Sequence, residues 1–564
     1  MGKKNALQAV DEPKSESWSL DEPGLGVLER AGLAGLYLAL SAVDGWAAQG
    51  DEKATVLRET LEWELSDREV RLAWKGKPRE ALGGLLRWAW QVKDGVLFLP
   101  GVHRTRDSLE NKWLRLGPHK GILQTFFQHN KVLPKGEQVR ELCSLDEQET
   151  FEIAYRPVKG ELPPCKDSNI KGIVQMKGFA GDKASLPSWA HPGSAQRFGK
   201  MESGWIGTGR LAFLLLFSPL ACVYFELPRS RVRDRNKLQM TANWAFLVPE
   251  FTDLSAMAAS IADVTSIAKD EFLRIRAQSM EDAALRFAAS YMGKRLEKNF
   301  DITALHIVAM GKVSHYQGQN VRKRVIRLAP DMLALRRYLK LLAVMPNAVR
   351  QRKNQGEEEN KGSHFIAVPL CRGLIARNLI DGAPWYTGLG EPDEMQRDEV
   401  ENSLDWERKR DNKGISRERY WFNKLFWERR SLMELASDES MWDEQREAAF
   451  VKVFHDALRK LLTKEEDATK RGGSRSFHER WEHRVEDIRR GLMRAKTQML
   501  LRKLVTELLA EAGGGKSLTE NGASLWQYLN HPFHWQRTRD LLLLSLVTFT
   551  DKRLADSDNS KQGE

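Results

Sequence analysis

The spacing of apolar residues changes once along this chain, and the change limits the folds that the chain can adopt. Up to about residue 380, alternating segments such as Glu69–Trp74 are typical of β-strands. They lie among segments such as Gly26–Leu40, whose apolar residues recur with helical spacing. From Ser416 to Thr548 only helical spacing remains, and it predicts a bundle of roughly three to six helices. The sequence therefore predicts an α+β fold, with a large mixed N-terminal domain followed by a C-terminal all-α helical bundle.

A polar stretch between these two parts predicts the domain boundaries. Residues 390–414 carry few apolar side chains and many charges, as linkers do. We expect a mixed domain over residues 1–390, a linker over 391–415, a helical bundle over 416–555 and a disordered tail over 556–564. Further strands are expected at Gly95–Leu99, Phe151–Val158, Trp244–Val248, Leu305–Met310 and Lys323–Leu328, and helices near Leu254–Ile267, Glu281–Tyr291 and Pro330–Val344.

The longest apolar run, Leu211–Leu227, bears on membrane association. It contains Pro219 and Glu226 and is marginal as a membrane span, whereas its aromatic and β-branched residues favour a buried strand. Residues 1–24 are polar, so no signal peptide is expected. The four cysteines lie far apart, without a CxxC pair. These features predict a reduced cytoplasmic protein with no membrane partner.

The charge and the tryptophans point to a polyanionic partner. The chain has 564 residues, a formal net charge of +11 and 18 tryptophans, many of them next to Lys or Arg. Aromatic rings stack on unpaired bases and cations neutralise phosphates, so this combination is typical of nucleic-acid binding. A single tryptophan is nevertheless a core residue about four times in five. The densest such segment is Arg419–Arg430, in which helical spacing places Tyr420, Lys424 and Trp427 near one face.

Two basic segments are candidates for phosphate binding. In the first, cations recur with period two, so an extended chain would place them on one side about 6.6 Å apart, close to the phosphate repeat of a single strand. The alternative is a solvated edge strand whose charges discourage aggregation. The second segment follows the turn YQGQN. The candidates are Arg229, Arg231, Arg233, Arg235 and Lys237 in the first segment, and Arg322, Lys323 and Arg324 in the second.

Two loops are candidates for reading base edges in DNA. The loop Phe127–Gly136 offers Gln128, Asn130 and Lys131, whose side chains can hydrogen-bond to bases. The second choice is the long glycine-rich loop over residues 177–209, with Lys200 and Thr208. Loops longer than about 15 residues are usually functional or disordered.

Catalytic and metal motifs are not found in the sequence. The pairs His478/His483 and His531/His534 have no third ligand in a recognisable pattern, and HExxH is absent. The segment AGGGKS ends like a phosphate-binding loop but lacks the required first glycine and follows a helical pattern. The sequence therefore predicts no catalytic residue, no metal and no cofactor.

Four segments resemble the large subunit of type I CRISPR Cascade complexes of the MYXAN, or DevT-like, subtype. These are Gly26–Leu40, Gly95–Arg106, Ser188–Arg197 with the apolar run that follows it, and Tyr420–Leu435. The resemblance implies a non-catalytic subunit at the crRNA 5′ end. Such a subunit recognises the PAM in double-stranded target DNA, promotes R-loop formation and guides the displaced strand. The implied partners are crRNA, DNA, the Cascade backbone and crRNA-end-capping subunits, and a helicase-nuclease or transposition adaptor.

Two other functions fit the residues alone. One is a metal-dependent nuclease with an unrecognised carboxylate cluster, and the other is a stand-alone RNA-binding protein.

The C-terminal bundle resembles a Cascade small subunit and is expected to fold by itself. Met395 is the natural internal start if the bundle is also made separately, because no other methionine lies between Met345 and Met433.

Overall fold

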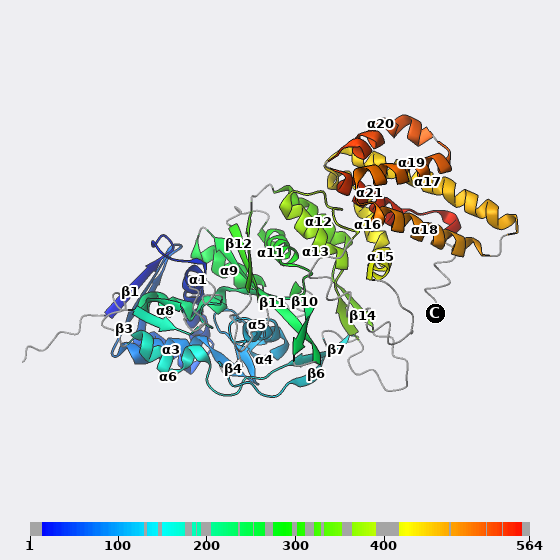
Figure 1. Ribbon diagram of the computed structural model, residues 1–564. Coiled ribbons are helices and arrows are strands. Elements are labelled where there is room, and N and C mark those ends of the chain that lie inside the picture. The colour runs from blue at the N-terminus through cyan, green and yellow to red at the C-terminus, as the bar shows by residue number, and fades with distance from the viewer. Residues whose placement is uncertain are drawn as a thin grey trace, which may run out of the picture. The chain divides into compact units, whose positions relative to one another are not determined.

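The fold comprises two compact units (Figure 1). One includes residues 1–227, 232–330 and 347–368, and the other includes 228–231, 331–346 and 369–564. We call them the mixed unit and the helical unit. The computed structural model describes residues 14–128, 132–144, 149–174, 183–187, 189–192, 205–234, 237–251, 253–264, 274–295, 302–310, 321–328, 332–351, 364–390, 417–472, 475–514, 516–532 and 534–554.

A largely buried helix, α1 (Val27–Ala48), belongs to the core of the mixed unit. It packs against α2 (Glu52–Thr60), α8 (Gly209–Leu215), the 3-10 turn Ser218–Ala221 and α9 (Leu254–Val264). Among the described residues, α1 is the one helix long and apolar enough to cross a membrane. Most of it is buried within the fold, which is how the core helix of a globular protein also behaves.

Two glycines let α1 approach its neighbours closely. A Cβ atom on Gly32 would lie 2.2 Å from the carbonyl oxygen of Leu214, and one on Gly35 would lie 2.1 Å from that of Phe217. Both distances are far below any van der Waals contact, and both involve backbone atoms. The segment Gly26–Leu40, which the sequence marks as helical, therefore also fixes how α1 packs.

The mixed unit also contains three small antiparallel sheets. The first has the order β1-β3-β2, and the other two are the pairs β4-β5 and β8-β9. Asp94 and Gly95 join β4 to β5 with φ values of 55° and 74°, the left-handed conformation that a tight hairpin turn requires. The bounds are β1 Lys14–Ser19, β2 Leu61–Leu65, β3 Glu69–Trp74, β4 Gln91–Lys93, β5 Val96–Phe98, β8 Lys183–Leu186 and β9 Trp205–Thr208, with helices α3 Pro78–Ala89 and α6 Asp167–Val174.

A fourth sheet has the order β14-β15-β7-β6, in which β15 runs parallel to β7 through the single pair His364↔Phe151. One face of this sheet packs on α5, in a cluster that includes Leu116, Cys143 and Phe151. The bounds are β6 Val139–Ser144, β7 Thr150–Tyr155, β14 Ala348–Gln351 and β15 His364–Ala367, with α4 Arg106–Glu110, α5 Lys112–Gln124 and the 3-10 turn Pro163–Cys165.

The fifth sheet has four strands in the order β10-β11-β12-β13. β11 and β12 pair from Trp244↔Met310 to Phe251↔Ile302, and they are apolar on both faces because helices cover the sheet. The bounds are β10 Val223–Asp234, β11 Lys237–Phe251, β12 Ile302–Met310, β13 Val321–Arg327 and α11 Met280–Arg295.

The helical unit contains no strand among its described residues in 332–346 and 369–554. Its helices are α12 Leu333–Val344, α13 Leu370–Asp381, α15 Arg417–Trp427, α16 Arg429–Ser437, α17 Gln445–Lys470, α18 Phe477–Arg494, α19 Gln498–Ala512, α20 Lys516–Asn530 and α21 Trp535–Thr548, with a 3-10 turn at Glu439–Met441. Local signals fix several ends. Ser476 and Glu479 form a capping box at the start of α18, and left-handed glycines end α13 at Gly382 and α19 at Gly513.

The segment after α13 packs into the core of the helical unit. The Tyr386 hydroxyl donates to the buried Glu447 carboxylate on α17 at 2.7 Å, and Arg537 on α21 pairs with the same carboxylate. Burial, followed by the charge of Glu447, raises the pKa of Tyr386 far above its usual range. The Trp421 indole donates to the carbonyl of Leu389 at 2.8 Å, and the amide of Gly388 donates to Asp540 at 2.7 Å. Residues 384–390 thus belong to the helical unit.

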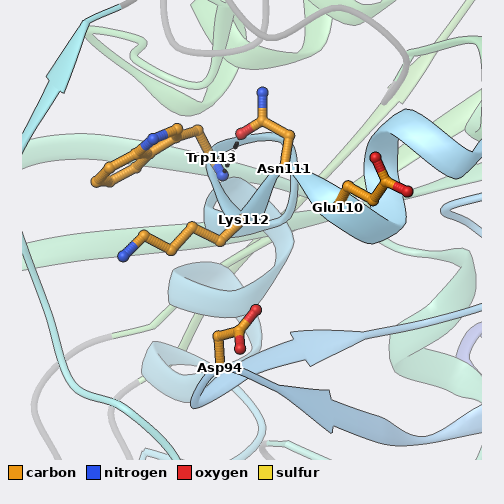
Figure 2. Close-up of a pocket in the computed structure, with 5 residues that line it drawn as sticks. All are labelled: Asp94, Glu110, Asn111, Lys112 and Trp113. Atoms are coloured by element: carbon orange, nitrogen blue, oxygen red, sulfur yellow. Dashed lines mark hydrogen bonds between the residues drawn. The ribbon is translucent and has the colours of Figure 1, made fainter.

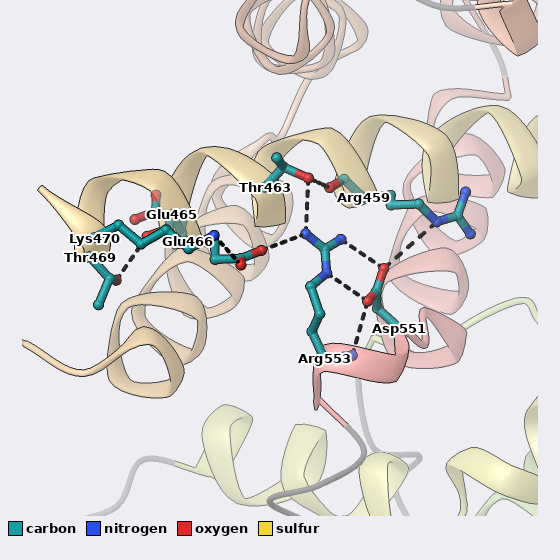
Figure 3. Close-up of polar contacts among 8 residues, drawn as sticks. All are labelled: Arg459, Thr463, Glu465, Glu466, Thr469, Lys470, Asp551 and Arg553. Atoms are coloured by element: carbon teal, nitrogen blue, oxygen red, sulfur yellow. Dashed lines mark hydrogen bonds and ion pairs between the residues drawn. The ribbon is translucent and has the colours of Figure 1, made fainter.

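Ionic contacts hold the end of the described chain against α17 (Figure 3). Arg553 donates to Asp551 at 2.8 Å and pairs with Glu466 at 3.0 Å, and it also donates to Thr463 at 3.0 Å. The hydrogen bond from Arg553 lowers the pKa of Asp551 to about 2. Arg459 approaches the same carboxylate at 3.8 Å. These contacts fix the direction of the chain after α21.

The predicted fold class is confirmed: the N-terminal part is mixed and the C-terminal part is helical. Apart from the apolar run Leu211–Leu227, the strands and helices expected in the first part are found, most of them with shifted ends. The expectation for Leu211–Leu227 was wrong in its first half. There the chain forms α8 and a 3-10 turn containing Pro219, and the strand begins only at Val223. The seven α-helices described from residue 417 onward exceed the expected three to six, because breaks at Glu428 and after Gly513 divide helical runs.

The predicted domain boundaries are not tested by this structure. The linker over residues 391–415 and the tail over 556–564 both lie outside the described residues. The boundaries therefore stay a prediction.

Candidate nucleic-acid interface

Both predicted basic segments lie on one sheet, at its two opposite edges. In the order β10-β11-β12-β13, the edge strand β10 carries Arg229, Arg231 and Arg233, and the edge strand β13 carries the second segment. The connection between β10 and β11 is so short that it can join only antiparallel neighbours. β12 and β13 are antiparallel as well, and β13 begins opposite Met310. Both basic segments are therefore brought to the same end of the sheet, a placement that the sequence did not predict.

The β10–β11 hairpin extends beyond the last residue of β12. β12 ends at Met310, opposite Trp244, whereas β11 begins earlier at Lys237. At about 3.3 Å per residue, the hairpin continues roughly 23 Å past that pair. The extended conformation that the sequence assumed for the first basic segment is found at Arg229, Arg231 and Arg233. Arg235 lies outside the described residues, as do the side chains of the other four members of the segment.

The three cations of the second segment do not share one face of β13. Arg322 and Arg324 point to one face and Lys323 to the other, because successive residues of a strand alternate. Arg322 and Lys323 are exposed, whereas Arg324 is half-buried and pairs with the buried Glu281 at the start of α11. The exposed positive charge of β13 therefore comes from Arg322, Lys323 and Arg327, and Arg324 already has a carboxylate partner.

The candidates for base reading are placed only in part. The backbone carbonyl of Gln128 accepts a hydrogen bond from Lys135 at 3.2 Å. Thr208 caps the start of α8, and its hydroxyl accepts from the amide of Leu211 at 3.3 Å. Asn130, Lys131 and Lys200 lie outside the described residues. The structure describes only Gln128 and Thr208 of these five residues, and the role of all five stays a prediction.

An open hollow of about 750 Å³ lies between the β4–β5 turn and the start of α5 (Figure 2). It is lined by Asp94, Glu110, Asn111, Lys112 and Trp113. The Asn111 side chain accepts from the amide of Trp113 at 3.0 Å and begins α5. Lys112 is paired with Glu141 and lies 4.9 Å from the centre of the Trp113 ring. Since two carboxylates line the hollow and its lysine is already paired, it is poorly suited to a phosphate.

Two buried histidines, His103 and His119, have structural roles. His119 accepts from the amide of Leu97 at 3.2 Å and lies 3.0 Å from the carbonyl oxygen of Arg156. His103 accepts from the amide of Leu99 at 3.0 Å. Burial lowers the pKa of both to about 3, so both are neutral at physiological pH. Within the described residues, no group of three or more His, Cys, Asp or Glu side chains could hold a metal ion.

Most of the tryptophans prove to be core residues. Twelve of them are buried, among them Trp88, Trp244 and Trp421. Trp427 at the end of α15 differs, because its side chain is 70% exposed. The Nζ atom of Lys424 lies 3.6 Å from the centre of its ring. Lys424 and Trp427 therefore share a face, as the sequence predicted, whereas the side chain of Tyr420, the third residue of that prediction, lies outside the described residues. Phe422 is buried.

Comparison with known proteins identifies the family. The model of the DevT N-terminal domain matches residues 17–216, and the model of the DevT C-terminal domain matches residues 438–564. The chain belongs to the DevT family. It is also 26% identical over 569 residues to the CRISPR-associated protein Cas8a1/Csx13 of Myxococcus xanthus (strain DK1622), across 97% of this chain and 92% of the relative. The resemblance to a DevT-like Cascade large subunit is confirmed.

In the sequence, the candidate interface lies between the two regions that match the DevT domain models. The DevT N-terminal match includes α1 and ends within the turn between α8 and β10. The DevT C-terminal match begins just before α17. Both basic segments of the four-stranded sheet, and Trp427, lie between the two matched regions. These positions are therefore assigned from their chemistry and place in the fold.

Proposed function

We propose that this Cascade large subunit recognises the PAM in double-stranded DNA, promotes unwinding and R-loop formation, and recruits a helicase-nuclease or a transposition adaptor. The observation that carries the proposal is the similarity to a CRISPR-associated protein along almost the whole chain, with DevT domain matches near both ends. The net charge of +11 and the basic end of the four-stranded sheet support a polyanionic partner. In this proposal, base pairing with the crRNA recognises the target sequence, while the chain recognises the PAM and the shape of the nucleic acid.

The proposal includes a non-catalytic role in the cytoplasm, without a cofactor or a membrane partner. The chain would bind the crRNA 5′ end together with the Cascade backbone and crRNA-end-capping subunits. Its own DNA binding would be weak and salt-dependent, because the basic segments are short and separate along the chain. Tight, PAM-selective binding would need the assembled complex.

The test is co-expression of the chain with the backbone subunits and a CRISPR array encoded beside it. We expect a complex that contains crRNA and binds a matched duplex only when a PAM is present. A chain that purifies alone, free of RNA, would contradict the proposal. Metal-dependent cleavage of DNA by the isolated chain, abolished by EDTA, would favour the nuclease instead.

The basic end of the sheet can be tested by salt dependence. Replacing Arg322 and Lys323 by Ala, or Arg229, Arg231 and Arg233 by Ala, should weaken DNA binding by the complex without sequence preference. The slope of log K against log salt should flatten by roughly 0.7–0.9 for each phosphate that the variant no longer neutralises. Arg68→Ala is the matched control, because Arg68 is exposed and paired with Asp21 at the turns of another sheet, β1-β3-β2. An unchanged slope would assign these cations to a solvated surface.

Base reading can be tested by PAM preference. Gln128→Ala, Asn130→Ala or Lys131→Ala should flatten the preference of the complex among PAM variants, because each base contact contributes about 1–3 kcal/mol of discrimination. Lys200 and Thr208 are the second choice. Thr208→Ser keeps the cap of α8 and is the control for Thr208→Ala. A proportional loss on every PAM variant would instead assign the residue to the DNA backbone.

A further inference from the structure

Trp427 is the most exposed large aromatic side chain among the residues for which burial is described. Its exposure is 70%, whereas twelve other tryptophans are buried. The ring stands at the end of α15, and Lys424, one helical turn earlier, lies 3.6 Å from the ring centre. A cation at this distance over an indole face is an attractive contact that also fixes the ring orientation. The orientation of the Trp427 ring is therefore fixed, while much of its surface is exposed to solvent.

The surroundings of this ring distinguish between possible partners. A protein partner would need a contiguous apolar patch around a central aromatic residue. Among the residues of the helical unit for which burial is described, the other exposed large hydrophobic side chains lie on α12, α19 and α20, and none lies on α15 or α16; they are Leu333, Leu339, Met499, Leu500 and Trp526. Close to Trp427 in the sequence, Asn423 and Arg430 are exposed and Lys424 is half-buried. The adjacent Glu428 is half-buried as well, and its carboxylate accepts from the amides of Leu370 and Cys371. A solitary ring among cations is instead the arrangement that binds single-stranded nucleic acid, in which bases stack and phosphates contact Lys or Arg.

We propose that Trp427 is a stacking platform for an unpaired base of single-stranded DNA, with Lys424 on the ring and Arg430 available to phosphate. The base stacks on the part of the ring that Lys424 leaves open. The inference deepens the proposed function, and it rests on that function only in the choice of DNA as the ligand. The site lies on the helical unit, apart in the sequence from both basic segments of the sheet.

The test uses the full chain alone at low salt and two labelled ligands of equal length, oligo(dT) and a strand without bases. Trp427→Ala should weaken oligo(dT) binding by about 5- to 150-fold, as expected when one base stack is removed. The same variant should bind the abasic strand as well as the unmodified chain does. Trp427→Phe should retain part of the affinity, and Trp427→Leu should behave like Ala. Trp526→Ala is the matched control, because this α20 tryptophan is 40% exposed and has Arg502 at 5.9 Å.

Several outcomes would overturn the inference. An equal loss on oligo(dT) and on the abasic strand would show that the ring reads no base. Full affinity of Trp427→Leu would indicate an apolar contact of another kind. A lower melting temperature of Trp427→Ala would show that the ring supports the fold. Because no guide RNA or partner subunit is present, these results stand apart from assembly of the complex, so failure here leaves the proposed function untouched.

Discussion

A fragment that starts at Met332 is expected to fold as a cooperative unit, whereas one that starts at Met395 is not. Met332 is the residue before α12, so the longer fragment keeps α12, α13 and residues 384–390. The shorter one loses the buried side chains of Trp385, Tyr386 and Leu389. At about 1.5–3 kcal/mol for each buried side chain, this loss is roughly 5–9 kcal/mol, comparable with the whole stability of a typical domain. Urea unfolding followed by circular dichroism measures the difference.

Two variants of the longer fragment separate packing from hydrogen bonding. Tyr386→Phe removes only the hydroxyl that donates to the buried Glu447 and should cost about 1.5–3 kcal/mol. Lys452→Ala, on the exposed surface of α17, should change the unfolding free energy little. A Met395 fragment that unfolds as cooperatively as the Met332 fragment would contradict the expectation. It would also support the internal start at Met395 that the sequence suggests for a separate small subunit.

The sequence revealed elements whose pattern is local. β3 alternates buried and exposed residues as EVRLAW predicts, and α1 follows its apolar spacing. β1 was missed because it carries one apolar residue, Trp18, and is a strand only through pairing with β3. The sequence analysis predicted β5 but not its hairpin partner β4, although the Asp94-Gly95 turn that joins them is a recognised hairpin signal.

The candidate interface, like the fold, could be predicted from the sequence only where its pattern is local. Charge and spacing identified the cations of β13, but they could not show that Arg324 is paired while Arg322 is exposed. The partner, Glu281, comes from α11, forty-three residues earlier in the chain. Likewise, composition marked residues 390–414 as polar but gave no sign that residues 384–390 pack between α17 and α21. Such contacts between distant segments depend on tertiary packing, which local patterns do not encode.

The second large effect is expected at the glycines of α1. Gly32→Ala and Gly35→Ala each add a methyl group that would lie 2.2 Å or 2.1 Å from a backbone carbonyl oxygen. The backbone there cannot turn away as a flexible side chain can, so α1 must move from residues 214–217. Overpacking of this kind costs about 1–3 kcal/mol per site. The double variant should lose at least as much as the more damaging single variant, because neighbouring sites that press on one segment do not simply add. Thermal unfolding of the full chain measures the loss as a lower melting temperature.

Gly45 offers a matched control within the same helix. A Cβ atom there meets nothing within 4 Å, so Gly45→Ala adds helix propensity without a clash. It should stabilise the chain by about 0.5–1 kcal/mol, opposite in sign to the other two changes. The contrast separates packing from propensity, because the three substitutions are chemically identical. A double variant at Gly32 and Gly35 that melts at or above the unmodified chain would show that α1 does not pack this closely on residues 214–217.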